Sequence, residues 1–142
     1  MVEYLKSTDK YNNLHAKIFA ETDPAKQNEA RRIATGADYA LTSVDAVTED
    51  GEFALADASG TRIGVFYAAR SVIVVIGANK IVKDLSAAKA RIHEYCYALE
   101  SARVRAAYGW AASSISNELF VHTNALMPAK FHFIIVKESL GF

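Results

Sequence analysis

Residues 37–85, ADYALTSVDAVTEDGEFALADASGTRIGVFYAARSVIVVIGANKIVKDL, decide the fold of this chain because they hold its most regular strand patterns and its clearest turn. Within them, residues 71–76 (SVIVVI) form a nearly continuous β-branched run, which is typical of a strand covered on both faces. Residues 39–47 are also rich in strand formers, and the sequence 49–51 (EDG) is a turn signal with glycine where φ is positive. We therefore expect two short strands around the turn at 49–51 and a buried strand at 71–76.

Helical signals lie on both sides of these strands. Asp23 and Pro24 open a helix predicted over residues 24–35, because Asp caps free amides and Pro has a helical φ. Residues 63–69 predict a short helix, and apolar residues spaced three and four apart predict a long helix from residue 84 or 86 to about 104. Residues 1–22 are expected to form an irregular arm or one weak helix.

The end of the chain completes an α/β pattern. A short edge strand is expected at residues 119–123, with Pro128 closing a turn, and residues 131–136 (FHFIIV) predict a final strand. The long helix between strands 71–76 and 131–136 provides enough chain for a right-handed crossover between parallel strands. We predict a three-layer α/β fold with a mostly parallel sheet and flanking helices, in one domain over residues 1–142.

Composition excludes several classes of protein. Lys plus Arg and Asp plus Glu both total 16, so the chain has no bulk attraction for nucleic acid or an anionic membrane. The longest strongly apolar run is far shorter than the roughly 20 residues of a membrane span. The start lacks a secretory signal, and the one cysteine forms no internal disulfide, so we expect a cytoplasmic protein.

The most suggestive local feature is the segment Ser59, Gly60, Thr61 and Arg62, which follows a strand and opens a helix. Free amides, the helix dipole and the Arg62 guanidinium would together favour a phosphate or carboxylate. The alternative is an ordinary capped helix whose arginine pairs with a nearby acid such as Asp57.

A second set of candidates follows the buried strand. Asn79 and Lys80 leave the carboxyl end of strand 71–76, and ligands gather at that end in open α/β sheets. We therefore predict that both contact a ligand, the alternative being that they are solvated loop residues.

No familiar catalytic motif is present. Cys96 lies in the apolar stripe of the long helix, where a core thiol is expected rather than a nucleophile. The four histidines show no metal spacing, and the sequence holds no nucleophile elbow or phosphate loop. We predict neither a metal nor a cofactor, and the candidates for acid–base chemistry are Glu49, Asp50 and Asp57.

Several pieces of this sequence, in this order and spacing, resemble the LUD domain family, the lactate-utilisation proteins that include the LutC-like subunit. They are the acidic turn 48–51 (TEDG), the segment 57–62 ending in Gly-Thr-Arg, the strand that leads into 77–85 (GANKIVKDL), and the terminal 140–142 (LGF). The similarity covers residues 30–105 and resumes at the last strand. It implies the NagB/RpiA/CoA-transferase-like fold and a role in oxidising lactate or similar hydroxy acids alongside iron–sulfur partner subunits.

The sequence also departs from the family pattern. The chain starts after the family's first βα portion, so the domain is expected to be a truncated version of that fold. Residues 106–117 hold none of the cysteines that many relatives carry there, with Ser116 where one is expected. The usual Gly-Asn-Arg reads Gly60, Thr61, Arg62, so the arginine is kept and the asparagine is lost.

Three functions remain open at this point. The first is an accessory protein without catalysis that binds a small anion through residues 59–62, Asn79 and Lys80. The second is a sugar-phosphate or CoA-type enzyme, and the third a degenerate interaction domain. The missing strands would expose an apolar sheet face, so we also predict a homodimer or higher homo-oligomer.

Overall fold

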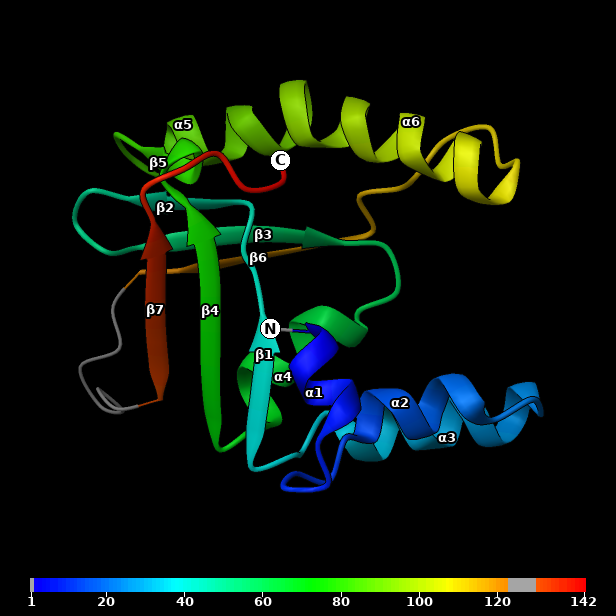
Figure 1. The fold of residues 1–142 in the computed structure, drawn as a ribbon. Coiled ribbons are helices and arrows are strands. Elements are labelled where there is room, and N and C mark those ends of the chain that lie inside the picture. The colour runs from blue at the N-terminus through cyan, green and yellow to red at the C-terminus, as the bar shows by residue number, and fades with distance from the viewer. Residues whose placement is uncertain (1, 123–129) are drawn as a thin grey trace.

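The computed structural model describes residues 2–122 and 130–142, whose elements are a set of helices around two small sheets (Figure 1). The helical elements are α1 (Val2–Ser7), α2 (Leu14–Ala20), α3 (Pro24–Ala34), α4 (Thr61–Ala68), the 3-10 turn η1 (Ala78–Lys80), α5 (Leu85–Ala90), the π-helical turn η2 (Arg91–Cys96) and α6 (Tyr97–Tyr108). The strands are β1 (Tyr39–Thr42), β2 (Ala46–Thr48), β3 (Phe53–Asp57), β4 (Ser71–Gly77), β5 (Ile81–Val82), β6 (Asn117–Val121) and β7 (Phe131–Val136). The predicted α/β class is confirmed.

The strands divide between two sheets. Sheet A has the order β1-β4-β7 and is wholly parallel. Sheet B has the order β5-β2-β3-β6, with β5 parallel to β2 and the other two pairs antiparallel. The crossover from β4 through the long helix to a parallel β7 is confirmed, and so is the hairpin whose turn holds Gly51 at φ +86°.

The residues rich in strand formers, 39–47, do not form one continuous strand. The chain leaves sheet A after Thr42 and enters sheet B at Ala46, so Ser43, Val44 and Asp45 form a corner between the sheets. Val44 is fully buried at this corner, and the buried Asp45 carboxylate accepts a hydrogen bond from the Ala56 amide at 2.6 Å. These buried contacts, which sequence periodicity does not report, stabilise the break.

Three layers result, with sheet B between sheet A and the long helix 85–108. The larger core fills the space between the sheets and α4, and its buried members include Phe53, Leu55, Phe66, Val72, Val74, Ile76 and Leu119. A smaller core joins the other face of sheet B to the long helix through Ala46, Ala54, Ala88 and Ile92. Alternation in β3 sends Phe53 and Leu55 to the larger core and Ala54 to the smaller one.

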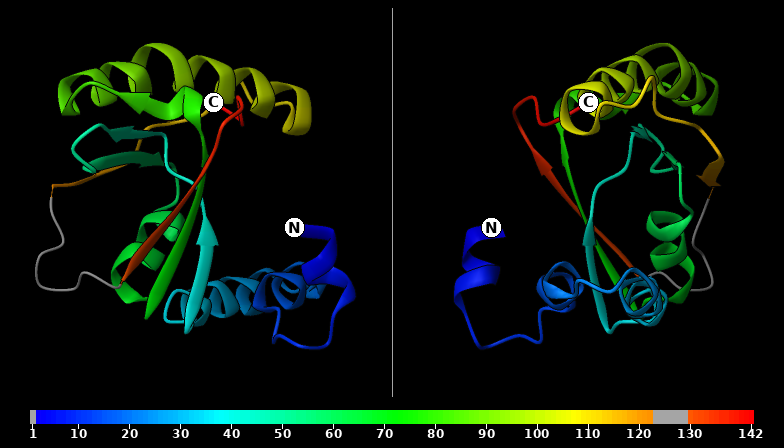
Figure 2. Two further views of the ribbon diagram at one scale, coloured as in Figure 1. Left: turned by 60° about the vertical axis from the view of Figure 1, so that its left-hand side comes forward. Right: turned by 90° about the vertical axis from the view of Figure 1, so that its right-hand side faces the viewer.

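The other face of sheet A is only partly covered, which corrects the prediction that strand 71–76 is buried on both sides. Alternate residues of β4 are buried, but Ile73 and Val75 are half-buried. We call the side formed by Tyr39, Leu41, Ile73, Val75 and Ile134 the open face; Tyr39, Leu41 and Ile134 are exposed, and neighbouring strands place these positions in register. Figure 2 shows α1 on this side, standing away from the strands.

Two helices begin at the capping residues that the sequence indicated. Asp23 caps α3, and Asp84 caps α5 by accepting from the Ala87 amide at 2.8 Å. The predicted arm at residues 1–22 is two short helices, α1 and α2. The predicted strand 119–123 is β6, Asn117–Val121, whereas Thr123 and Pro128 lie outside the described residues.

Candidate functional site

The carboxyl ends of β1 and β4 are neighbours in sheet A, and the residues that follow them form a buried polar cluster. Lys80, in η1 directly after β4, is only 5% exposed. Its Nζ donates to Ser43 Oγ at 3.2 Å and to the Val44 carbonyl at 3.0 Å, and both acceptors follow β1. The lysine therefore joins the two strand ends and holds its charge inside the protein.

An ion pair lies next to this lysine. Arg62, in the first turn of α4, places Nη2 3.1 Å from Asp45 Oδ2 and also donates to the Ala56 carbonyl. The Asp45 side chain is 10% exposed, whereas that of Arg62 is 37% exposed, so the acid is buried and the base reaches toward solvent. The sequence left open an ion pair between Arg62 and a nearby acid such as Asp57. The structure pairs Arg62 with Asp45 instead.

The long helix supplies a third basic side chain from its π-helical turn. Arg91 Nε donates to the Asp45 carbonyl at 3.0 Å, and its guanidinium lies 4.8 Å from the centroid of the Tyr95 ring. Its Nη2 is buried and has no hydrogen-bond partner among the described residues. Buried donors are nearly always satisfied, so this nitrogen is available for an acceptor that residues 2–122 and 130–142 do not provide. A π-helical turn is itself frequent at functional sites.

We call Arg62, Lys80 and Arg91, gathered around Asp45, the basic cluster. Burial lowers the pKa of Lys80, the Asp45 charge opposes that shift, and the Arg62 and Arg91 charges add to it. Burial, followed by the Asp45 charge, raises the pKa of the Cys96 thiol, which confirms a core cysteine rather than an activated one. With three bases and one acid, the cluster favours an added anion.

The Ser59–Thr61 segment is arranged differently from the sequence hypothesis. Gly60 is the N-cap at φ +82°, and the Asp57 carboxylate accepts from the amides of Ser59, Arg62 and Ile63. The helix start thus already holds a carboxylate of the chain itself. Of the four residues predicted there, the structure brings Arg62 alone into the basic cluster.

The remaining predicted residues are spread over three places. Glu49 and Asp50 are exposed in the hairpin turn, at the opposite end of β2 from Asp45. Asn79 uses both ends of its amide to hold the C-terminal segment, with Nδ2 3.0 Å from the Gly141 carbonyl and Oδ1 3.0 Å from the Leu140 amide. Lys80 is the second predicted residue in the cluster.

Sequence reasoning missed Ser43, Asp45 and Arg91. Asp45 carried a usable signal, because an acid inside a strand-like apolar run is costly to bury unless it is paired. Arg91 carried none, since a polar residue beside the apolar stripe of a helix is usually solvated.

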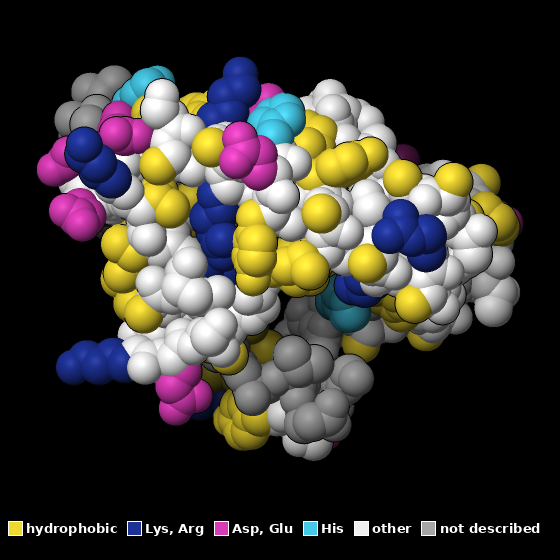
Figure 3. Space-filling view, turned by 90° about the horizontal axis from the view of Figure 1, so that it is seen from above, with side chains coloured by type: hydrophobic (Ala, Val, Ile, Leu, Met, Phe, Trp, Pro, Cys, Tyr) yellow, Lys and Arg dark blue, Asp and Glu magenta, His cyan; other side chains and the backbone are white. Residues whose placement is uncertain are grey.

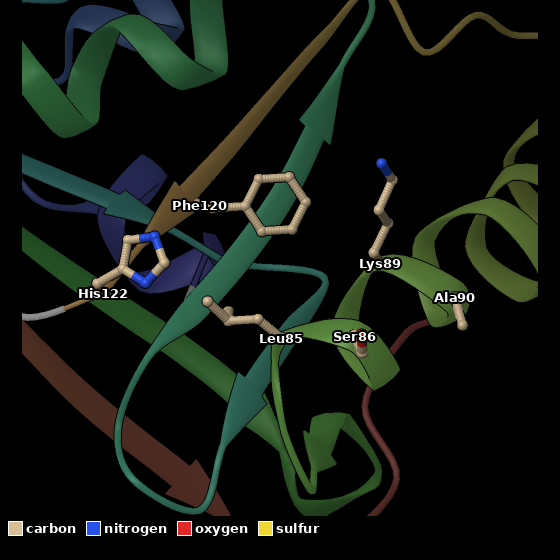
Figure 4. Close-up of a pocket in the computed structure, with 6 residues that line it drawn as sticks. All are labelled: Leu85, Ser86, Lys89, Ala90, Phe120 and His122. Carbon is tan, nitrogen blue, oxygen red and sulfur yellow. The ribbon is translucent and has the colours of Figure 1, made fainter.

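The described residues also form a shallow groove of about 520 Å³ between α5 and β6 (Figure 4). It is lined by Leu85, Ser86, Lys89, Ala90, Phe120 and His122. Figure 4 shows Leu85 and Phe120 near its middle, with His122 and Lys89 on opposite sides. No lining residue belongs to the basic cluster, so we do not assign the anion to this groove.

Seen from above, Lys and Arg side chains lie between apolar ones and do not form a continuous basic surface (Figure 3). Within residues 2–122 and 130–142, no helix has the length and apolar character needed to cross a bilayer. No group of three or more His, Cys, Asp or Glu side chains in the same part of the chain is placed to hold a metal ion.

Comparison with known proteins identifies the family of this chain. The model of the LUD domain matches residues 4–136, which is nearly the whole chain. No curated protein and no solved structure gives a significant match. Because the family model covers so much of the sequence, the chain belongs to the LUD domain family, whose members are associated with lactate utilisation.

Proposed function

We propose that this protein is an accessory protein of lactate or related hydroxy-acid utilisation that binds a small anion at the basic cluster and performs no catalysis itself. One observation carries the proposal: the buried Arg91 Nη2 has no partner among the described residues, although it lies beside Asp45 and Lys80. A carboxylate or a similar anion would accept from this nitrogen and offset the excess of positive charge.

The placement of the acids supports a binding role over a catalytic one. Glu49 and Asp50 are exposed in a turn, and Asp57 is occupied with three backbone amides. Asp45 is paired with Arg62. A general base would have to be a carboxylate free to take a proton beside the ligand, and none of these four acids is placed in that way.

One observation favours the enzymatic alternative. Burial lowers the pKa of Lys80, and a lysine that loses its proton readily is able to act as a base or nucleophile. A sugar-phosphate or CoA-type enzyme of the same fold would use this amine. Turnover that disappears in Lys80→Met, while ligand binding is retained, would favour that alternative.

The open face of sheet A supports self-association. Parallel sheets are normally covered on both faces, yet Tyr39 and Leu41 are 72% and 42% exposed and Ile134 is 47% exposed. None of the five residues that define the open face is Lys, Arg, Asp or Glu, and its exposed neighbour His132 lies in register with Ile73. Two copies can therefore meet there across a twofold axis without placing Lys, Arg, Asp or Glu side chains of like charge opposite each other. We propose a second copy of this chain as the occupant; iron–sulfur subunits, which the family resemblance implies as partners, would bind elsewhere.

The binding proposal is tested by a thermal-shift and calorimetric screen against L-lactate, glycolate, sugar phosphates and CoA esters. We expect stabilisation by a small carboxylate, and Arg91→Gln should weaken its binding at least tenfold, because a charge-assisted hydrogen bond contributes about 1.5–3 kcal/mol. Arg62→Ala should reduce binding as well.

Arg103→Gln is the matched control, since it makes the same chemical change on the same helix at an exposed guanidinium paired with Glu100. It should bind the anion as the unmodified protein does. Equal binding by Arg91→Gln and Arg103→Gln would contradict the site, and the absence of any ligand effect would favour the interaction domain.

A further inference from the structure

The segment after β7 turns back over the carboxyl end of β4 and is fastened there, as Figures 1 and 2 show near the end marked C. The Ala78 amide donates to the Glu138 carbonyl at 3.0 Å. The Asn79 amide group then bonds both the Leu140 amide and the Gly141 carbonyl, each at 3.0 Å. The side chain of one residue thus binds both a backbone N–H and a backbone carbonyl of the returning segment.

Gly77 shows how closely the segment approaches. A Cβ at this position would lie less than 3.0 Å from Asn79 Oδ1, the Leu140 nitrogen and the Glu138 oxygen. The φ of Gly77 is −83°, which any residue adopts, so the requirement for glycine comes from space and not from backbone conformation. Two backbone atoms of the returning segment therefore contact the end of β4 without room for a methyl group.

The same segment passes beside the lysine of the basic cluster. A Cβ built on Gly141 would lie 3.8 Å from Lys80 Nζ, while Ser43 and Val44 contact that nitrogen from the β1 side. Lys80 belongs to a turn that follows a strand end, where lysine is normally solvated, yet it is 5% exposed. The position of residue 141 indicates that the returning segment helps to exclude water from this ammonium.

We propose that residues 138–142 are a strap that closes the basic cluster over Lys80, and that Asn79 is the positioning residue that holds the strap in place. That the strap closes an anion site rests on the proposed function, whereas the shielding of Lys80 by the strap does not. In this arrangement Asn79 acts on the chain's own backbone and not on the ligand, and an anion enters or leaves when the strap is released. Release breaks a few exposed hydrogen bonds and leaves both hydrophobic cores intact.

The test measures the reactivity of Lys80 in the absence of any ligand. The protein is treated with an amine-acylating reagent, and the acylation rate of each lysine is followed by peptide mass spectrometry, with the exposed Lys83 as the internal reference. We expect Lys80 to react at least fivefold faster in Asn79→Ala, and Asn79→Asp to give an intermediate rate because it keeps the acceptor for the Leu140 amide. Gly77→Ala, which displaces the strap sterically, should also accelerate the reaction.

Asn117→Ala is the matched control, because its side-chain amide also donates to a backbone carbonyl, that of Asp57, away from the strap. It should leave the Lys80 rate unchanged. Circular dichroism and melting curves establish that each variant is folded before its rates are compared.

An unchanged Lys80 rate in folded Asn79→Ala and Gly77→Ala would overturn the strap. This outcome would leave the anion site untouched, since binding of L-lactate and its loss in Arg91→Gln are measured separately. Conversely, faster acylation in a protein that binds no anion would support the shielding by residues 138–142 and contradict the proposed function.

Discussion

The carboxylate of Asp45 and the guanidinium of Arg62 form an ion pair of 3.1 Å although 17 positions separate the two residues. Asp45 lies at the corner where the chain leaves sheet A, and Arg62 lies in the first turn of α4. Their pairing places an acid among basic side chains, next to Lys80. Stability and anion binding therefore depend on Asp45 with opposite signs.

Asp45→Asn should separate these two effects. The amide keeps an acceptor for the Ala56 nitrogen but leaves the Arg62 and Lys80 charges without a counter-charge, so the free energy of unfolding should fall by about 2 kcal/mol. The affinity for a small carboxylate should rise, because the added anion replaces the lost charge. Urea unfolding and titration calorimetry measure both, with exposed Asp38→Asn as the control. Weaker anion binding in Asp45→Asn would contradict the assigned cluster.

Lys80 should make stability depend on pH. Burial lowers its pKa in the folded state below the ordinary 10.5, so the unfolded chain binds the proton more tightly. The free energy of unfolding should therefore rise as pH increases from the folded-state pKa toward 10.5, whereas affinity for an anion should fall over the same interval. Lys80→Met should lack this rise, which chemical denaturation at a series of pH values will detect. Parallel curves for the two proteins would refute the burial argument.

Asp57 should be structural. Asp57→Ala removes the acceptor of three amides at the start of α4, and loss of such a cap should lower the free energy of unfolding by about 1–2 kcal/mol. Anion binding at the cluster should persist in the folded fraction. We expect a lower melting temperature with an unchanged dissociation constant; loss of binding without loss of stability would indicate that Asp57 contacts the ligand.

The open face should respond to a single charge. Ile134→Lys places an ammonium group on a surface without Lys, Arg, Asp or Glu. In a twofold contact the ammonium groups of the two copies would lie near each other and repel. Multi-angle light scattering at micromolar concentration should show a dimer or larger species for the unmodified protein and a monomer for this variant. Tyr67→Lys, at a 69% exposed position on α4, serves as the control. An unmodified protein that is strictly monomeric would rule out self-association through the open face.

Local chemistry predicted much of the fold. The β-branched run of β4, the glycine turn and the Asp-Pro start of α3 each appear where their sequence signals place them, because these signals act within a few residues. The division into two sheets was not predictable in this way. It depends on buried contacts of Val44 and Asp45 with distant segments, and a strand propensity is the same on either side of that corner.

The candidate site shows the same limit of local reasoning. The position of Lys80 after a buried strand was informative because the strand end fixes where the next residues lie. The amides at 59–61 looked free in sequence, but the side chain of Asp57 folds back onto this segment. Arg91 joins the cluster only because the long helix crosses sheet B, a packing relationship that no periodicity within the helix specifies.

The π-helical turn Arg91–Cys96 has a consequence for insertions and deletions in the long helix. Such a turn accommodates an additional residue within an α-helix. Deleting one residue within this turn would restore ordinary α-helical winding and keep α6 in its present orientation relative to α5, because the wider π-helical turn already absorbs the additional residue. Deleting one residue at the start of α6 would instead rotate everything that follows by about 100°, so the buried Ser101 and Val104 would turn away from the body of the protein. The long helix is therefore expected to tolerate the loss of a residue within Arg91–Cys96 but not at the start of α6.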